Sequence, residues 1–87
     1  MSQAVNAQAI RDWLVQHLAA LLRVDQASID PCARFSELGV DSTAAISLTG
    51  ALSDWLDADI EPDLALIHNS IDAVAEHVAA RLTEARA

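Results

Sequence analysis

The stretch "ELGVDSTAAISL" (residues 37–48) marks the point where an irregular segment gives way to a helix. Gly39 permits the positive φ that a sharp turn needs, and Asp41 and Ser42 are residue types that cap helix N-termini. Small and apolar residues follow Ser42. No G-x-S-x-G motif surrounds Ser42 and no histidine lies close to it in sequence, so the stretch does not predict a serine hydrolase.

A helix is predicted from about Ser42 to Leu56, because apolar residues recur there at helical spacing. The predicted core face consists of Ala45, Leu48, Thr49, Leu52, Trp55 and Leu56. The opposite face carries Thr43, Ser47, Gly50 and Asp54, with Ile46 on its edge. This outer face has short side chains and almost no charge. Gly50 in mid-helix costs roughly 1 kcal/mol relative to alanine, which either close approach by a partner or drift on a tolerant surface explains.

Two more helices flank this one. The first is predicted from about Asn6 to Leu22, with Asn6 or Ser2 as its cap, and the last begins after Ser70 as its cap. The first presents Ile10, Trp13, Leu14, Leu18, Leu21 and Leu22 on one face, and the last presents Ile71, Val74, Ala75, Val78 and Leu82. Residues 83–87 are expected to fray.

The segments between the helices show no steady period. Residues 23–41 are predicted to form a long ordered loop, which Val24, Ile29, Phe35 and Leu38 anchor on the core. A short helical turn is expected around Asp63–Ile67. We therefore predict an all-α fold: a small bundle of three main helices plus one short helix, with a long ordered loop between the first two. Residues 1–87 form one expected domain with a core at about 6–82.

The charge of the chain excludes several classes of partner. The net charge is −8, and residues 25–76 carry eleven acidic side chains against one arginine, Arg34. Such a surface repels nucleic acid and anionic membranes; it either steers basic partners or keeps a small domain in solution. The N-terminus lacks a signal peptide pattern, and no uncharged run is long enough to span a bilayer. We expect a monomeric, cytoplasmic domain.

Outside residues 37–48, the acidic, cysteine and histidine side chains are not interpreted as metal ligands or catalytic groups. The acids from Asp57 to Asp63 alternate like a calcium loop, but Pro62 occupies the glycine position and His68 the closing glutamate position. Cys32 has no second cysteine at metal spacing. His17, His68 and His77 are interpreted as structural or solvent-exposed, although any of them could approach Ser42 in three dimensions. No metal site and no catalytic residue are predicted.

Ser42 itself has two interpretations. The first turn of a helix offers free backbone N–H groups and a partial positive charge, which favour an attached anion by ~0.3–1 kcal/mol. A serine that bears a phosphodiester would be well placed there. In the other interpretation, Ser42 or Asp41 is only the helix cap.

The order of the features resembles the acyl carrier protein family. A helix precedes "SIDPCARFSELGVDS" (residues 28–42), a second helix follows, and "LIHNSIDAVAEHV" (residues 66–78) closes the pattern. The resemblance implies that a phosphopantetheinyl transferase attaches 4′-phosphopantetheine from coenzyme A to Ser42, with Asp41 and Gly39 in support. The arm then carries acyl groups as thioesters, and the chain itself catalyses nothing.

Details of the resemblance favour polyketide or hybrid polyketide–nonribosomal peptide biosynthesis, because Asp41 precedes the serine as in acyl carriers and residues 66–78 are similar to the end of modular polyketide synthase carriers. Asn69 replaces a usual proline, Thr43 a usual leucine, and Ser47 a glutamate that is common in fatty acid carriers. The alternatives are a peptidyl or aminoacyl carrier and a carrier-like docking module without the arm. Implied partners are an acyltransferase or acyl-adenylate ligase, then a ketosynthase or condensation domain. The expected docking residues are Thr43, Ile46, Ser47 and Gly50, with Asp54 and Glu37 on the rim.

Overall fold

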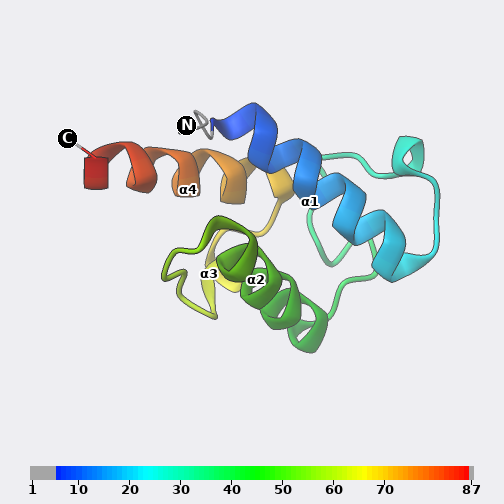
Figure 1. Cartoon of the computed structure of the whole chain (residues 1–87). Coiled ribbons are helices and arrows are strands. Elements are labelled where there is room, and N and C mark those ends of the chain that lie inside the picture. Colours follow the sequence, from blue (N-terminus) through cyan, green and yellow to red (C-terminus); the bar gives the residue numbers. More distant parts are fainter. Residues whose placement is uncertain (1–5, 87) are drawn as a thin grey trace.

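Helices make up nearly all the regular structure of residues 6–86, which are the residues that the computed structural model describes (Figure 1). Helix α1 spans Ala7–Leu22, α2 spans Ser42–Leu56, α3 spans Leu64–Ile67 and α4 spans Ile71–Arg86, and a 3-10 turn, η1, spans Gln26–Ser28. Within this range no strand forms, and Arg34 and Ser70 make one isolated antiparallel bridge. The predicted all-α class, with three main helices and one short one, is confirmed.

The helix ends follow from local hydrogen bonds. The Asn6 side chain accepts a bond from the Ala9 N–H at 2.9 Å, which confirms it as the cap of α1, whereas Ser2 lies outside the described residues. The Ser70 hydroxyl accepts a bond from the Ala73 N–H at 3.2 Å and caps α4 as predicted. Helix α4 continues to Arg86 rather than ending near Leu82, so the expected end of the last helix was placed too early.

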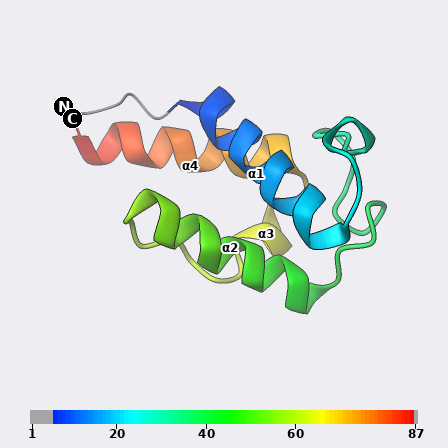
Figure 2. The same cartoon turned by 45° about the vertical axis from the view of Figure 1, so that its right-hand side comes forward.

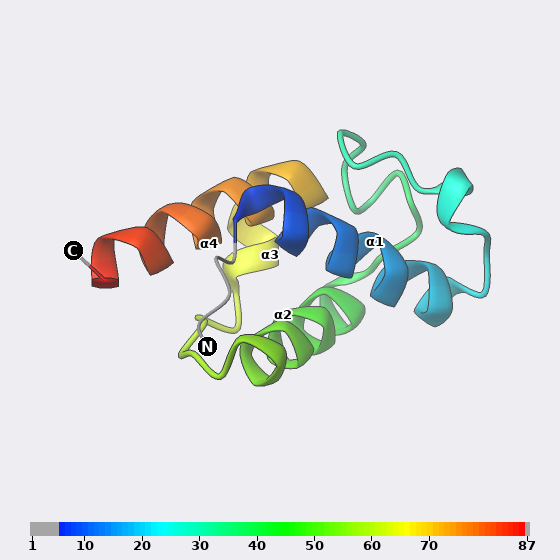
Figure 3. The same ribbon diagram turned by 45° about the horizontal axis from the view of Figure 1, so that its top comes forward.

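The core lies where α1, α2 and α4 meet, and α3 packs against α2 (Figures 1, 2 and 3). Figure 2 shows α1 beside α4, with α2 running beneath them. Each large aliphatic side chain that is fully buried contributes about 1.5–3 kcal/mol. Those with almost no exposed surface are Ile10, Leu14, Leu18, Leu48, Leu52, Ile71 and Val78.

Three side chains predicted to face the core are exposed instead: Leu21 at 46%, Val24 at 44% and Trp55 at 43%. Leu21 lies in the last turn of α1, which packs against η1 rather than against another long helix. Val24 follows the left-handed residue that ends α1, where the chain turns away. Trp55 lies at the margin of the core face of α2, and its ring stacks on Trp13 rather than entering the core. The helices were predicted correctly, but Trp55 lies at the edge of the apolar face of α2, Leu21 lies at the end of α1 and Val24 lies beyond that end.

The long loop from residue 23 to residue 41 is ordered, as predicted, because it is tied to α4 and to the core. The Phe35 N–H donates to the Asn69 carbonyl at 2.8 Å, and the Asp72 N–H donates to the Pro31 carbonyl at 3.0 Å. Ile29 and Phe35 are buried at 7% and 4% exposure. These contacts fix the position from which the chain enters α2.

Candidate functional site

A tight turn directs the chain into α2. The Val40 N–H donates to the Phe35 carbonyl at 2.9 Å, and both side chains are buried. Gly39 adopts φ = +87°, a conformation that costs other residues energy because their Cβ crowds the carbonyl oxygen. A Cβ placed on Gly39 would contact nothing within 4 Å, so the requirement for glycine is torsional. The turn predicted at Gly39 is therefore present.

Asp41 is the N-cap of α2. Its backbone is extended, and its Oδ1 accepts a hydrogen bond from the Ala44 N–H at 2.8 Å. The Asp41 carbonyl accepts a second bond from the Ala45 N–H at 2.9 Å. A capping side chain of this kind stabilises a helix by about 0.5–2 kcal/mol relative to alanine. Since Asp41 performs this task, Ser42 does not have to.

Ser42 is the first residue of α2, and its side chain is exposed. Within residues 6–86 its hydroxyl makes no hydrogen bond, and neither do the backbone N–H groups of Ser42 and Thr43. The free hydroxyl is a reachable acceptor for a transferred group. The two free N–H groups and the positive end of the α2 dipole lie beside it, so the site fits a phosphodiester.

The three histidines are engaged elsewhere. His17 stacks on Trp13 with ring centroids 4.8 Å apart, and His68 stacks on His77 at 4.3 Å. None of the hydrogen bonds in the described part of the chain joins a histidine to Ser42. A serine nucleophile needs a base within hydrogen-bond reach, and this arrangement does not provide one.

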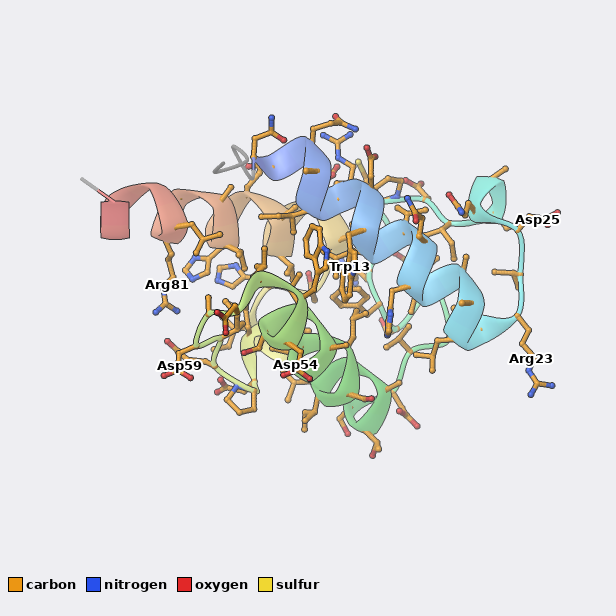
Figure 4. The ribbon with its side chains drawn as sticks, in the orientation of Figure 1. Trp13, Arg23, Asp25, Asp54, Asp59 and Arg81 are labelled. Atoms are coloured by element: carbon orange, nitrogen blue, oxygen red, sulfur yellow. The ribbon has the colours of Figure 1, made fainter. Side chains whose placement is uncertain are left out.

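The residues expected to dock partners are all exposed, but they do not form one patch. Thr43, Ile46, Ser47 and Gly50 lie along the outer side of α2, and Ile46 is 44% exposed. Glu37 lies in the entry turn, where its Oε1 accepts a bond from the Arg34 N–H at 2.9 Å. Asp54 is twelve residues from Ser42, which is about 18 Å along the helix. Asp54 therefore belongs to the opposite end of α2 (Figure 4).

A small polar cluster that sequence analysis missed ties the loop to α1 and α4. The Cys32 thiol donates to Asp72 Oδ2 at 3.1 Å, and Arg11 Nε lies 3.0 Å from Asp72 Oδ1. The hydrogen bond to Asp72 is the main cause that raises the pKa of the Cys32 thiol above its usual value, and the Asp72 charge adds to it. Cys32 and Asp72 are forty residues apart, and no local pattern links them.

The acidic segment from Asp57 to Asp63, which follows α2 and for which no calcium site was predicted, contacts α4. Glu61 in this segment pairs with Arg81 of α4 at 3.2 Å, and Figure 4 shows Arg81 pointing from α4 toward the loop. In the part of the chain that the structure describes, no group of three or more histidine, cysteine, aspartate and glutamate side chains is arranged to hold a metal ion. No helix among the same residues is long and apolar enough to cross a bilayer.

Comparison with known proteins matches residues 12–78 to a family model described as a phosphopantetheine attachment site. The chain is 28% identical over 81 residues to the acyl carrier protein TtuC of Teredinibacter turnerae, covering 93% of each chain. It is 31% identical over 81 residues to a phenolphthiocerol/phthiocerol polyketide synthase of Mycobacterium tuberculosis, and this match covers 92% of the chain but only 4% of that synthase.

A solved structure is similar over most of both chains. It is a free-standing peptidyl carrier protein from a secondary metabolic pathway of Acinetobacter baumannii, with a TM-score of 0.82 and 30% identity. The similarity covers 88% of this chain and 96% of that protein. Sequence family and fold therefore indicate the same kind of protein, a carrier with a phosphopantetheine attachment site.

Proposed function

The chain belongs to the phosphopantetheine attachment-site family of carrier proteins, and on this premise we propose that Ser42 is the residue that bears the 4′-phosphopantetheine arm. The observation that supports this assignment is an exposed hydroxyl at the first position of a capped helix, which makes no hydrogen bond to any of residues 6–86. The family's cofactor is 4′-phosphopantetheine, whose thiol holds acyl groups as thioesters when the arm is attached.

The residues around Ser42 contribute position and charge rather than catalysis. Asp41 fixes the start of α2, and the buried side chains of Phe35 and Val40 hold the turn that precedes it. The free N–H groups of Ser42 and Thr43 favour a phosphate at this helix end. The base and metal that activate the serine are supplied by the modifying transferase. The chain is thus a substrate of other enzymes and not an enzyme itself.

The proposed pathway is polyketide or hybrid polyketide–nonribosomal peptide biosynthesis. Two observations support it: relatives named acyl carrier protein and polyketide synthase, and the aspartate that precedes Ser42. The similarity to a peptidyl carrier structure favours the peptidyl or aminoacyl alternative only in part. Because the match covers 4% of the synthase, the activity of that large protein is not transferred to this chain.

Proposed partners are the enzymes that such a carrier must visit: the transferase, an acyltransferase or acyl-adenylate ligase, and a ketosynthase or condensation domain. The outer side of α2 near Ser42 is the proposed docking face, with Ile46 as its one large apolar side chain. A carrier-like docking module without the arm is the competing function. The intact Asp41–Ser42 pair at the helix start speaks against it.

Incubation of the apo protein with coenzyme A, Mg²⁺ and a promiscuous phosphopantetheinyl transferase tests the proposal. Intact mass spectrometry should show the addition of one phosphopantetheinyl group to each chain. Protein that stays at its apo mass, while a known carrier in the same reaction is modified, would instead support the docking module.

A further inference from the structure

Asp72, the second residue of α4, contacts two other parts of the molecule through one carboxylate. Its Oδ1 lies 3.0 Å from Arg11 Nε of α1, and its Oδ2 accepts a hydrogen bond from the Cys32 thiol of the loop at 3.1 Å. The backbone N–H of Asp72 donates a further bond to the Pro31 carbonyl at 3.0 Å. One residue therefore joins α1, the loop and the start of α4.

The loop from residue 31 to residue 35 lies antiparallel to the segment that leads into α4. At one end of this short pairing, the Phe35 N–H donates to the Asn69 carbonyl at 2.8 Å. At the other end, the side chain of Asp72 holds Cys32. The pairing is thus fixed at both ends, and Asp72 provides the only side-chain bond to the loop from α4 within residues 6–86.

The same loop leads directly to Ser42. The Phe35 carbonyl accepts a bond from the Val40 N–H at 2.9 Å, which closes the turn that precedes the cap residue Asp41. A displacement of residue 35 is therefore passed to the start of α2 through a short hydrogen-bonded turn. No hydrogen bond or ion pair of the described residues joins Asp72 to Ser42, so an influence of Asp72 on Ser42 has to act through the loop.

We propose that Asp72 is a positioning residue for the modification of Ser42, because its bond to Cys32 holds the loop in the place from which the serine hydroxyl is presented. The inference rests on the proposed function of Ser42. In that reaction the serine oxygen bonds to the phosphorus that carries pantetheine, the bond from this phosphorus to adenosine bisphosphate breaks, and the hydroxyl proton passes to a base of the transferase. Such a transfer slows steeply when the attacking oxygen is displaced.

A simpler role for Asp72 is to stabilise α4 alone. An acidic side chain in the first turn of a helix interacts favourably with the helix dipole, and this role does not require Cys32. Substitution of Cys32 separates the two roles, because it removes the contact with the loop but leaves Asp72 and the start of α4 unchanged. Cys32 is exposed, so alanine or serine at this position should not disturb the core.

The test measures the modification of the apo protein by coenzyme A and Mg²⁺ with the transferase in excess. The rate at saturating transferase reports the transfer step, and the transferase concentration that gives half this rate reports docking. Cys32→Ala should lower the saturated rate about threefold, as expected for the loss of one hydrogen bond, and leave the half-saturating concentration unchanged. Cys32→Ser keeps a donor for Asp72 and should restore the rate.

Asp72→Ala should lower the saturated rate about tenfold, because it removes the contacts with both Cys32 and Arg11. Glu76→Ala is the matched control, since it removes the same charge from an exposed position one turn further along α4. This control should change neither constant. If Asp72→Ala does not fold, the two Cys32 variants decide the question on their own.

Hydrogen exchange provides a readout at the turn itself. The Val40 amide should exchange several-fold faster in Cys32→Ala than in the unaltered protein, since its bond to Phe35 closes the turn. A saturated rate for Cys32→Ala equal to that of the unaltered protein would overturn the proposal. A Cys32→Ser variant as slow as Cys32→Ala would also overturn it, because the lost contact would then not be the hydrogen bond. Failure of the unaltered protein to be modified at all would instead contradict the proposed function of Ser42.

Discussion

Asp41 and Ser42 divide two tasks at the start of α2. Both residue types can cap a helix, and the sequence left open which of them does so. Asp41 accepts the bond from Ala44, while the Ser42 hydroxyl stays exposed and makes no hydrogen bond within residues 6–86. This freedom is what the proposed attachment of the arm to Ser42 requires, because the hydroxyl would have to enter the active site of the transferase. Capping by its neighbour keeps the helix end rigid without engaging the reactive oxygen.

Cys32 provides a test of the cluster that ties the loop to α1 and α4. Its pKa is raised, first by the hydrogen bond to Asp72, so the folded protein keeps the thiol protonated to a higher pH than the unfolded chain does. This contribution to stability is fully present below the thiol's pKa in the unfolded chain and is lost as the pH rises through the folded pKa. Only the thiolate is alkylated rapidly. Iodoacetamide should therefore modify native Cys32 with a midpoint at higher pH than the same thiol in guanidinium.

Two substitutions should move this alkylation midpoint in opposite directions. Asp72→Asn should lower it, because both the hydrogen bond to a carboxylate and the negative charge are lost. Arg11→Gln should raise it further, because the Arg11 charge lowers the pKa of Cys32. Identical midpoints in the native protein and in Asp72→Asn would show that the thiol does not interact with Asp72 in solution.

At the scale of elements, α2 has two unlike ends and an outer side of small residues. Its N-terminal end presents Ser42 and its C-terminal end presents the exposed side chains of Asp54 and Trp55, while Leu48 and Leu52 are buried on the inner side between them. Of the outer residues, Ile46 is large and apolar and Gly50 has no side chain. These two residues allow the roles of the outer side to be tested.

The two glycines should respond to alanine with opposite signs. Gly39→Ala should destabilise the protein by about 1–2 kcal/mol, because φ = +87° is unfavourable for a residue with a Cβ. Gly50→Ala should stabilise it by about 0.5–1 kcal/mol, since a Cβ there contacts nothing within 4 Å and alanine favours the helix. Urea unfolding measures both values. Changes of the same sign would mean that the turn or the helix is not formed as described.

Ile46→Ala should separate docking from folding. Ile46 is 44% exposed, so its truncation should cost well under the 2–5 kcal/mol expected for truncating a buried aliphatic residue. Leu48→Ala, at a site 2% exposed, is the control for a core residue. If the outer side of α2 binds the transferase, Ile46→Ala should raise the KM of the modification reaction several-fold while Tm changes little. An unchanged KM would remove Ile46 from the docking face.

Sequence periodicity predicted the elements well, and its errors have physical causes. Long amphipathic stripes determined α1, α2 and α4, because each repeats its apolar positions over several turns. Leu21 and Trp55 lie at the end and the edge of such stripes, where the presence of a neighbouring element decides burial. The Cys32–Asp72 contact and the stacked rings join distant parts of the chain, so no local pattern could reveal them. The turn at Gly39 and the helix start at Ser42 were predictable because they depend on adjacent residues, whereas the choice of Asp41 as the cap required the structure.

At the scale of the whole molecule, small size and acidic charge determine how it meets other proteins. The net charge of −8 on 87 residues favours the approach of positively charged surfaces over negatively charged ones. The buried contacts of Phe35 and Val40, and the loop's hydrogen bonds to the start of α4, hold the end of α2 that bears Ser42. The fold thus supports one exposed serine at a rigid helix end while the outer side of α2 remains accessible.

The position of the modification tests the central claim most directly. After reaction with coenzyme A and the transferase, the protein should be digested, and fragmentation mass spectra should localise the added group. We predict that the group lies on Ser42, that Ser47→Ala is modified as fully as the unaltered protein, and that Ser42→Ala is not modified. A phosphopantetheinyl group on Ser42→Ala, or one localised to any other residue of the unaltered protein, would contradict the account.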